Sequence, residues 1–193
     1  MSPTPVLIVG LGNPGERYEN TKHNVGFWVV NTLLERMGIK RLEHMCHALV
    51  ARCSWKGRSV ILAKPVTYMN DSGKAVKALS HRFDVLPENL CVVYDDMNLE
   101  FGVLRMRKSG SDGGQNGVKS VIQSLGTQDF PRLRIGIGKA EGDWRDYVLS
   151  EFSPEEKAYI MQVVERAADA VGTFVTDGVL AAMNRYNRQV KPD

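Results

Sequence analysis

Short apolar segments rich in valine, isoleucine and leucine recur along this chain, separated by longer segments with helical periodicity. Six of the short segments are predicted to be strands, because runs of this length and composition are typical of a sheet that is largely buried. They lie at residues 6–9, 48–53, 59–63, 90–94, 103–107 and 133–137. Strands that alternate with helices indicate a three-layer α/β domain.

Five segments carry apolar residues at helical spacing and are predicted to be helices. They cover residues 24–37, 72–82, 116–125, 154–174 and 176–185. Gly38 and Gly126 follow the first and third as C-terminal stops. Ser153 and Pro154 begin the fourth as its N-cap and first helical residue. Residues 140–147 show no such pattern and are predicted to be a loop.

The length and composition of the chain favour one cytoplasmic domain over residues 1–193. The sequence has 193 residues, 43% of them hydrophobic, and no apolar run of about 18 residues that would span a membrane. The first ten residues lack the positive region that begins a secretory signal. Three cysteines without a C-x-x-C pair are typical of reduced thiols.

Positive charge is concentrated in one part of the chain. Residues 103–139 contain seven basic and two acidic residues, whereas the whole chain has a formal net charge of +3. Such a segment can bind phosphates, although a solvated basic face remains an alternative. Within it, Arg105 and Arg107 lie two residues apart on a predicted strand and so share a face, and Arg132 and Arg134 repeat this spacing.

The loop after the first predicted strand, GLGNPGERYENTKHN, contains the G-x-G-x-x-G spacing of a dinucleotide-binding turn. In such a turn a helix begins at once and an acidic residue follows about 20 residues later. Here Asn13-Pro14-Gly15 indicates a turn, the next residues are polar, and the first helix begins only near Asn24. We therefore expect no nucleotide cofactor. Polar loops that leave the carboxyl ends of strands often carry the sites of α/β proteins.

Three further polar segments are candidates for function. KPVTYMNDSG places Met69 and Asn70 before a helix, where Asn70 can equally be an N-cap. VVYDDMN places Asp95 after a buried strand, where it can orient a histidine or merely keep a loop soluble. GSDGGQNGVKS is a glycine-rich loop that opens a helix and can bind an anion, but it does not match a P-loop.

Other chemistries are disfavoured. His44 and His47 have no second group of ligands after them, so no metal site is expected. Cys53 and Cys91 lie in apolar strands, where buried and inert thiols are the rule.

Taken together, the polar segments resemble the bacterial peptidyl-tRNA hydrolase family. The matching pieces are LIVGLGNPGERYENTKHNVGF, KPVTYMNDSGKAV, VVYDDMNLEFG, GGQNGVKS and RLRIGIG, and the tail YVLSEFSPEE also fits. The resemblance implies a single α/β domain around a twisted, mostly parallel mixed sheet. It implies hydrolysis of the ester between a peptide and the 3′ end of tRNA. It also implies no cofactor or metal, and we expect a monomer with no membrane partner.

The resemblance also implies roles for particular residues. His23 corresponds to the catalytic general base, Asp95 to the carboxylate that orients it, and Asn116 to a group that positions water or the oxyanion. The residues that correspond to substrate-binding positions are Asn13, Tyr18, Met69 and Asn70. The pair that clamps a tRNA phosphate corresponds to Arg107 and Arg134, and Arg105 and Lys108 are flanking charges.

The chain departs from the family pattern at three places: Gln115 stands where many relatives have histidine, and residues 96–101 and 139–141 also differ. None of these departures removes a catalytic group. The alternatives are an RNA-binding relative without catalysis, a nucleotide-dependent oxidoreductase and a peptidase of the same architecture.

Overall fold

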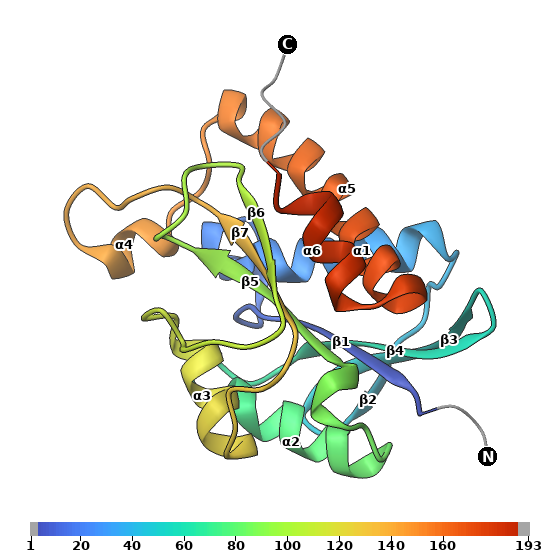
Figure 1. Cartoon of the computed structure of the whole chain (residues 1–193). Helices are drawn as coiled ribbons and strands as arrows, with labels where there is room; N and C mark the ends of the chain where they lie inside the picture. Colours follow the sequence, from blue (N-terminus) through green and yellow to red (C-terminus); the bar gives the residue numbers. More distant parts are fainter. Residues whose placement is uncertain (1–3, 189–193) are drawn as a thin grey trace.

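The computed structural model describes residues 4–188, which contain a seven-stranded sheet of order β2-β3-β4-β1-β5-β7-β6 (Figure 1). The ends of the expected domain, residues 1–3 and 189–193, lie outside the described residues. The strands are β1 (Val6–Gly10), β2 (Glu43–Met45), β3 (Ala48–Trp55), β4 (Arg58–Pro65), β5 (Leu90–Asp96), β6 (Leu104–Arg107) and β7 (Arg132–Gly136).

The centre of the sheet is parallel and its edges are antiparallel. β1 pairs in parallel with β4 and β5, and β5 pairs in parallel with β7. β2, β3 and β6 each pair antiparallel with a neighbour. The carboxyl ends of β4, β1, β5 and β7 therefore meet at one edge, where α/β sheets carry their binding sites.

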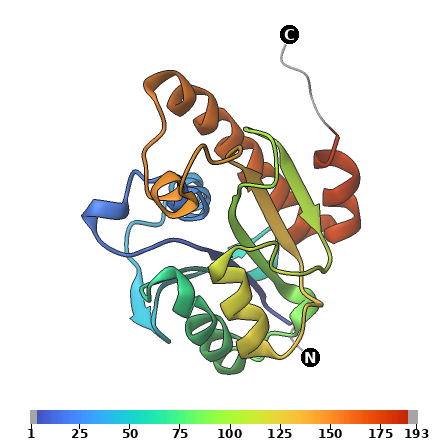
Figure 2. The same cartoon turned by 90° about the vertical axis from the view of Figure 1, so that its left-hand side faces the viewer.

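Helices cover both faces of the sheet, which confirms the three-layer α/β class. α1 (Val25–Arg36), α5 (Pro154–Asp177) and α6 (Val179–Tyr186) cover one face, and α2 (Ser72–Arg82) and α3 (Asn116–Leu125) cover the other (Figure 2). α4 (Trp144–Val148) lies beside the carboxyl edge. Short 3₁₀ turns precede several elements: η1 (Glu16–Tyr18), η2 (Lys22–Asn24), η3 (Met69–Asp71) and η4 (Pro87–Asn89).

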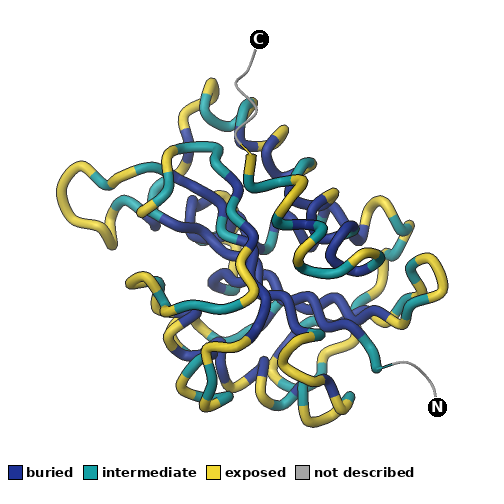
Figure 3. The backbone as a smooth tube through the Cα atoms, in the orientation of Figure 1, coloured by how far each residue is buried: buried dark blue, intermediate teal, exposed yellow. Residues whose placement is uncertain are grey.

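Two apolar cores result, one on each face of the sheet. Figure 3 shows that the strands at the centre of the molecule are mostly buried. Along β1, Ile8 belongs to the core under α1 and α5, whereas Leu7 and Val9 belong to the core under α2 and α3. All five residues of β1 are buried, as expected for a central strand covered on both faces. None of the helices in residues 4–188 is long and apolar enough to cross a bilayer.

The structure corrects several of the predicted boundaries. The loop predicted at residues 140–147 contains the start of α4, whose N-cap Asp143 accepts the backbone N–H groups of Arg145 and Asp146. β2 was not predicted, because its sequence Glu-His-Met has no apolar alternation, and it exists through pairing with β3. α5 continues to Asp177, beyond the predicted end at residue 174.

Two glycines allow α1 to lie unusually close to β1. A Cβ atom added to Gly10 would be 2.2 Å from the carbonyl oxygen of Gly26, and one added to Gly26 would be 2.4 Å from that of Val93. Contacts this short are not possible for any other residue. This close approach fixes the start of α1, and with it the preceding residue pair His23 and Asn24, over the carboxyl edge of the sheet.

Gly26→Ala should therefore destabilise the protein. Overpacking a rigid contact usually costs about 1–3 kcal/mol, and here the obstructing atoms belong to the backbone. We expect the free energy of unfolding in urea to fall by at least that amount. Glu35→Ala, an exposed change in the same helix, is the control and should leave the midpoint nearly unchanged. Equal stability of the two variants would contradict the close approach.

Candidate functional site

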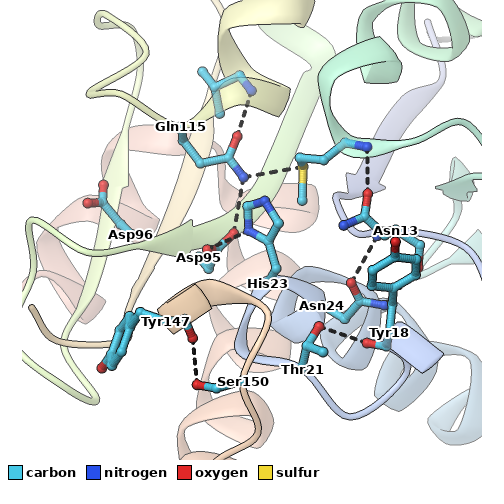
Figure 4. A network of polar contacts seen from close by, with 12 residues as sticks. Asn13, Tyr18, Thr21, His23, Asn24, Asp95, Asp96, Gln115, Tyr147 and Ser150 are labelled. Carbon is cyan, nitrogen blue, oxygen red and sulfur yellow. Dashed lines mark hydrogen bonds and ion pairs between the residues drawn. The ribbon is translucent and has the colours of Figure 1, made fainter. Parts of the chain in front are cut away.

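His23 and Asp95 form a buried pair at the carboxyl edge of the sheet. Nδ1 of His23, in η2, is 2.8 Å from Oδ2 of Asp95 near the end of β5. Figure 4 shows the two side chains pointing toward each other. Only 7% of His23 and 2% of Asp95 is exposed. An ionised carboxylate can only accept, so the hydrogen bond assigns the proton to Nδ1 and leaves Nε2 available to another partner.

The environment of His23 changes its pKa in two opposite ways. Burial lowers the pKa of the imidazole because it disfavours the charged form. The negative charge of Asp95 and the hydrogen bond to it raise the pKa, and together they outweigh burial, so that the pKa of His23 lies above its usual value of 6.5. His23 therefore keeps its proton to a higher pH than a free imidazole does.

A cavity lined by carboxamide side chains lies beside this pair. It has a volume of about 330 Å³. Its lining includes His23, Met69 and the carboxamides of Asn13, Asn70 and Asn116. Asn70, in η3, and Asn116, the first residue of α3, are exposed and line the cavity. Asn70 does not cap α2, which begins after Asp71.

Asn13 is held from two sides. Its backbone N–H donates to Oδ1 of Asn24 at 2.9 Å, and its carbonyl accepts from Nδ2 of Asn24 at 2.9 Å. Its side-chain oxygen accepts the backbone N–H of Met69 at 2.7 Å. Because the oxygen is occupied, the side chain of Asn13 can offer a hydrogen-bond donor to a ligand, and Met69 is fixed by the same contact.

Gln115 contacts the other oxygen of Asp95. Its Nε2 donates to Asp95 Oδ1 at 3.0 Å, and its Oε1 accepts the backbone N–H of Val118 at 2.8 Å (Figure 4). Sequence reasoning noted Gln115 only as a departure from a family pattern. No local signal indicates that its side chain would reach β5.

A second, basic cavity lies further along the edge. It has a volume of about 180 Å³ and is lined by three arginines, Arg107, Arg132 and Arg134, and by the glycine-rich loop 109–113. Arg134 Nε is 2.7 Å from Asp96 Oδ2. Within the described residues Arg107 makes no ion pair, so its charge is not balanced.

Arg132 is a residue that the sequence analysis did not select for this cavity. Its guanidinium is buried and donates to the carbonyl oxygens of Ser111, at 3.1 Å, and Gln128, at 2.7 Å. Burial lowers the pKa of Arg132. The Arg-x-Arg spacing of residues 132 and 134 was the available signal, since it placed both side chains on one face.

Three other selected residues lie outside these cavities. Arg105 donates from Nη1 to the carbonyl of Asn187 at 3.3 Å, toward α6, and Lys108 is exposed next to Arg107. Neither lines the basic cavity. Tyr18 stacks edge-on against Tyr68, with ring centroids 6.3 Å apart, and it is Tyr68 that lines the amide cavity.

A small cavity of about 70 Å³ lies between the other two and is lined by residues from both, including His23, Asp96 and Gly113. Trp144 and Val148 of α4 line both this cavity and the amide cavity. The segment predicted as a loop thus supplies a wall of the site. The three cavities form a row along the carboxyl edge, with His23 beside the boundary of two of them.

Metal and thiol chemistry find no support in the described residues. No group of three His, Cys, Asp or Glu side chains within residues 4–188 is arranged to hold a metal ion. Burial raises the pKa of the Cys91 thiol to about 12, which disfavours the thiolate needed by a nucleophile.

The sequence is similar to one protein family along most of its length. A family model described as peptidyl-tRNA hydrolase matches residues 7–193. A peptidyl-tRNA hydrolase of Chloroflexus aggregans is 52% identical over 184 residues, which cover 94% of this chain and 98% of the relative. One of Symbiobacterium thermophilum is 46% identical over 185 residues, with the same coverage.

The structure is similar to solved structures of the same family. A crystal structure of the peptidyl-tRNA hydrolase of Acinetobacter baumannii has a TM-score of 0.89 and 34% sequence identity. The alignment covers 97% of this chain and 96% of the other. An Arg119Gln mutant of the same enzyme also has a TM-score of 0.89.

Asp95→Asn should lower the pKa of His23. Without the negative charge, burial remains as the main influence and favours the neutral imidazole. A titration of the imidazole resonances by NMR should place the midpoint of His23 above 6.5 in the wild type and lower in the variant. The resonances of His81, exposed on α2, should not respond to the substitution and serve as an internal control.

The same titration has a consequence for stability. Because folding raises the pKa of His23, the pair stabilises the fold fully below about pH 6.5, and this contribution is lost as the pH rises through the folded-state pKa. The difference in unfolding free energy between the wild type and Asp95→Asn should therefore be largest below about pH 6.5 and become smaller as the pH rises through the folded-state pKa of His23. An unchanged His23 midpoint in the variant would contradict the assigned role of Asp95.

Proposed function

The chain belongs to the peptidyl-tRNA hydrolase family, and on this premise we propose how it hydrolyses the ester between a peptide and the 3′ end of tRNA. His23 is the general base that activates water. The observation that carries the proposal is the buried contact between His23 and Asp95 at 2.8 Å, next to a cavity lined by three asparagines. The comparisons give no support to the alternative of a relative without catalysis.

The reaction begins with water. Neutral His23 accepts a proton from water at Nε2 while the water oxygen attacks the ester carbonyl. Asp95 accepts the Nδ1 hydrogen, keeps the ring in this tautomer and stabilises the imidazolium that forms. The bond between the acyl carbon and the ribose oxygen then breaks, and the imidazolium returns its proton to that oxygen.

The carboxamides suit a substrate whose peptide sequence varies. Asn116, at the first turn of α3, donates its side-chain N–H to the developing oxyanion or positions the water. Asn13 and Asn70 bond the peptide main chain, which is the same in every peptide. Since the oxygen of Asn13 is occupied by the N–H of Met69, Asn13 acts as a donor to a peptide carbonyl. Met69 lies against the end of the peptide, and Tyr18 supports Tyr68 from behind.

The basic cavity binds a phosphate of the tRNA. Arg107 and Arg134 form the clamp. Arg132, buried in the wall of the cavity, adds positive charge, and its hydrogen bond to the carbonyl of Ser111 holds the glycine-rich loop in place. Arg105 and Lys108 are flanking charges that act at longer range. Since Asp96 partly balances Arg134, Arg107 provides most of the free positive charge of the clamp.

The groups of this site meet at hydrogen-bond distance within a single chain, so the proposed mechanism needs no residue from a second copy, and we propose that the enzyme acts as a monomer. A role in translation follows from the substrate, and we place the enzyme in the cytoplasm, where peptidyl-tRNA is released from ribosomes.

His23→Ala should remove general-base catalysis while tRNA binding survives. Loss of a general base typically lowers turnover by about 10²–10⁴. The expected result is a kcat lower by at least this range with a similar KM, measured as release of N-acetyl-amino acid from N-acetyl-aminoacyl-tRNA. His81→Ala is the control. Near-normal turnover by His23→Ala would refute the assignment, and rapid hydrolysis of tRNA with a free α-amino group would argue against a peptidyl substrate.

Arg107→Ala should weaken tRNA binding rather than chemistry. Loss of one phosphate contact should raise KM and reduce the slope of log binding against log salt by about 1. Lys108→Ala is the matched control, because Lys108 is adjacent and exposed but does not line the basic cavity, and it should have the smaller effect. An equal loss on a small N-acyl-amino-acid ester without tRNA would exclude a phosphate clamp.

A further inference from the structure

Gln115 connects the start of α3 to the buried pair of His23 and Asp95. We propose that Gln115 is a positioning residue for the proposed hydrolysis: its amide N–H holds the carboxylate of Asp95 in the orientation that serves His23. This inference rests on the proposed function and adds a residue that acts through Asp95 instead of touching the substrate. It also gives a role to Gln115, which stands where many members of the family have histidine.

The orientation of the Gln115 amide is determined by its neighbours. A backbone N–H can only donate, so the N–H of Val118, 2.8 Å away, requires the oxygen of Gln115 on that side. The NH₂ group then faces Asp95 Oδ1 at 3.0 Å and the sulfur of Met69 at 3.4 Å. An amide held in this way is a fixed donor to Asp95.

Asp95 needs this donor because it has little access to water. Only 2% of the residue is exposed, and a buried polar atom without a partner is costly. His23 bonds one carboxylate oxygen and Gln115 bonds the other. Two donors on different oxygens fix the rotation of the carboxyl group. Without Gln115, one carboxylate oxygen loses its partner, and the group is free to rotate away from Nδ1 of His23.

The backbone that carries Gln115 is itself well held. Its N–H donates to the carbonyl of Asp112 at 3.0 Å, and its carbonyl accepts the N–H of Lys119 at 3.0 Å. The helix that follows is fixed against α2, where the N–H of Gly73 donates to Ser120 Oγ at 2.9 Å and a Cβ on Gly73 would be 2.1 Å from the carbonyl of Ser120. Since Asn116 is the next residue, one rigid helix start positions both Asn116 and Asp95.

Other charged or titratable groups surround the pair without replacing Gln115. Asp96 of β5 is bonded to Arg134 of β7. Lys22 of η2 donates to Ser150 and to the carbonyl of Glu151, away from His23. Arg145 of α4 and Tyr68 line the amide cavity with His23. In the described residues the hydrogen-bond partners of the Asp95 side chain are His23 and Gln115.

Gln115→Glu separates positioning from helix capping. The glutamate keeps the length of the side chain and an oxygen for the N–H of Val118, but it replaces the donor to Asp95 with a second carboxylate oxygen. If both carboxylates ionise, the added charge favours the imidazolium of His23. If they share a proton, Asp95 becomes active only when that proton leaves. In either case the acidic limb of the kcat–pH profile moves to higher pH.

The test compares wild type, Gln115→Glu and Gln123→Glu. Gln123 is exposed on the same helix, so it controls for the chemical change. We expect the limb of Gln115→Glu to shift by about 1 pH unit or more, with kcat at pH 7 about tenfold lower and recovering in alkali. The His23 midpoint or its chemical shifts in NMR should also change. The profile and spectra of Gln123→Glu should match the wild type.

A second variant, Gln115→Ser, keeps the proposal testable if Gln115→Glu does not fold. Gln115→Ser keeps a capping oxygen but is too short to reach Asp95, so kcat should fall about tenfold or more with KM unchanged. Melting temperatures equal to that of the wild type would show that the variants fold. If these folded variants also have the kcat, the pH profile and the His23 titration of the wild type, Gln115 is only a helix cap and the proposal is wrong. If the wild type fails to hydrolyse N-acetyl-aminoacyl-tRNA, the proposed function fails, whereas the NMR titration still decides whether Gln115 controls the pair.

Discussion

The site depends on one buried carboxylate, that of Asp95. A carboxyl group that is 2% exposed is tolerated only when its oxygens have partners, and the two partners here come from η2 and from the residue before α3. These segments are separated by about half of the chain. Asp95 therefore fixes the position of two elements relative to β5. Its contact with His23 also orients the imidazole that is the proposed base.

The last two residues of β5 divide the carboxyl edge into two regions. Asp95 contacts His23 beside the amide-lined cavity (Figure 4). Asp96 forms an ion pair with Arg134 beside the basic cavity. The first region is lined by three carboxamides and by apolar side chains, with Arg145 as the charged residue of its lining besides His23, and suits a peptide of varied sequence. The second carries three arginines and suits a nucleic-acid backbone. In the proposed function, a substrate that is part peptide and part tRNA spans both regions, with its ester next to His23.

Much of the fold could be predicted from periodicity, and the exceptions have local causes. The strands and long helices bury enough apolar residues for a pattern to be visible. In α4 only Val148 is buried, so a helix of five residues shows no apolar stripe and depends on the cap from Asp143. β2 is a polar segment that becomes a strand only because β3 offers it a free edge. The predicted end of α5, residue 174, falls short of the observed end at Asp177. The apolar pattern ends near residue 174, but the helix continues until Gly178.

The residue types needed for the site were determined by the sequence alone: a histidine, an acid at the end of a buried strand, three carboxamides and a pair of arginines. The histidine and the carboxamides lie in or next to the loops that leave strands, whereas the arginines lie on predicted strands. Which of them meet was decided by the tertiary structure. Arg132 and Arg134 have the same spacing on one strand as Arg105 and Arg107, yet Arg132 is buried against carbonyls while Arg105 turns toward α6. Likewise the contact of Gln115 with Asp95 follows from how α2, α3 and the sheet pack. Periodicity is a property of neighbours along the chain, whereas a hydrogen bond between distant residues depends on the packing of the elements that carry them.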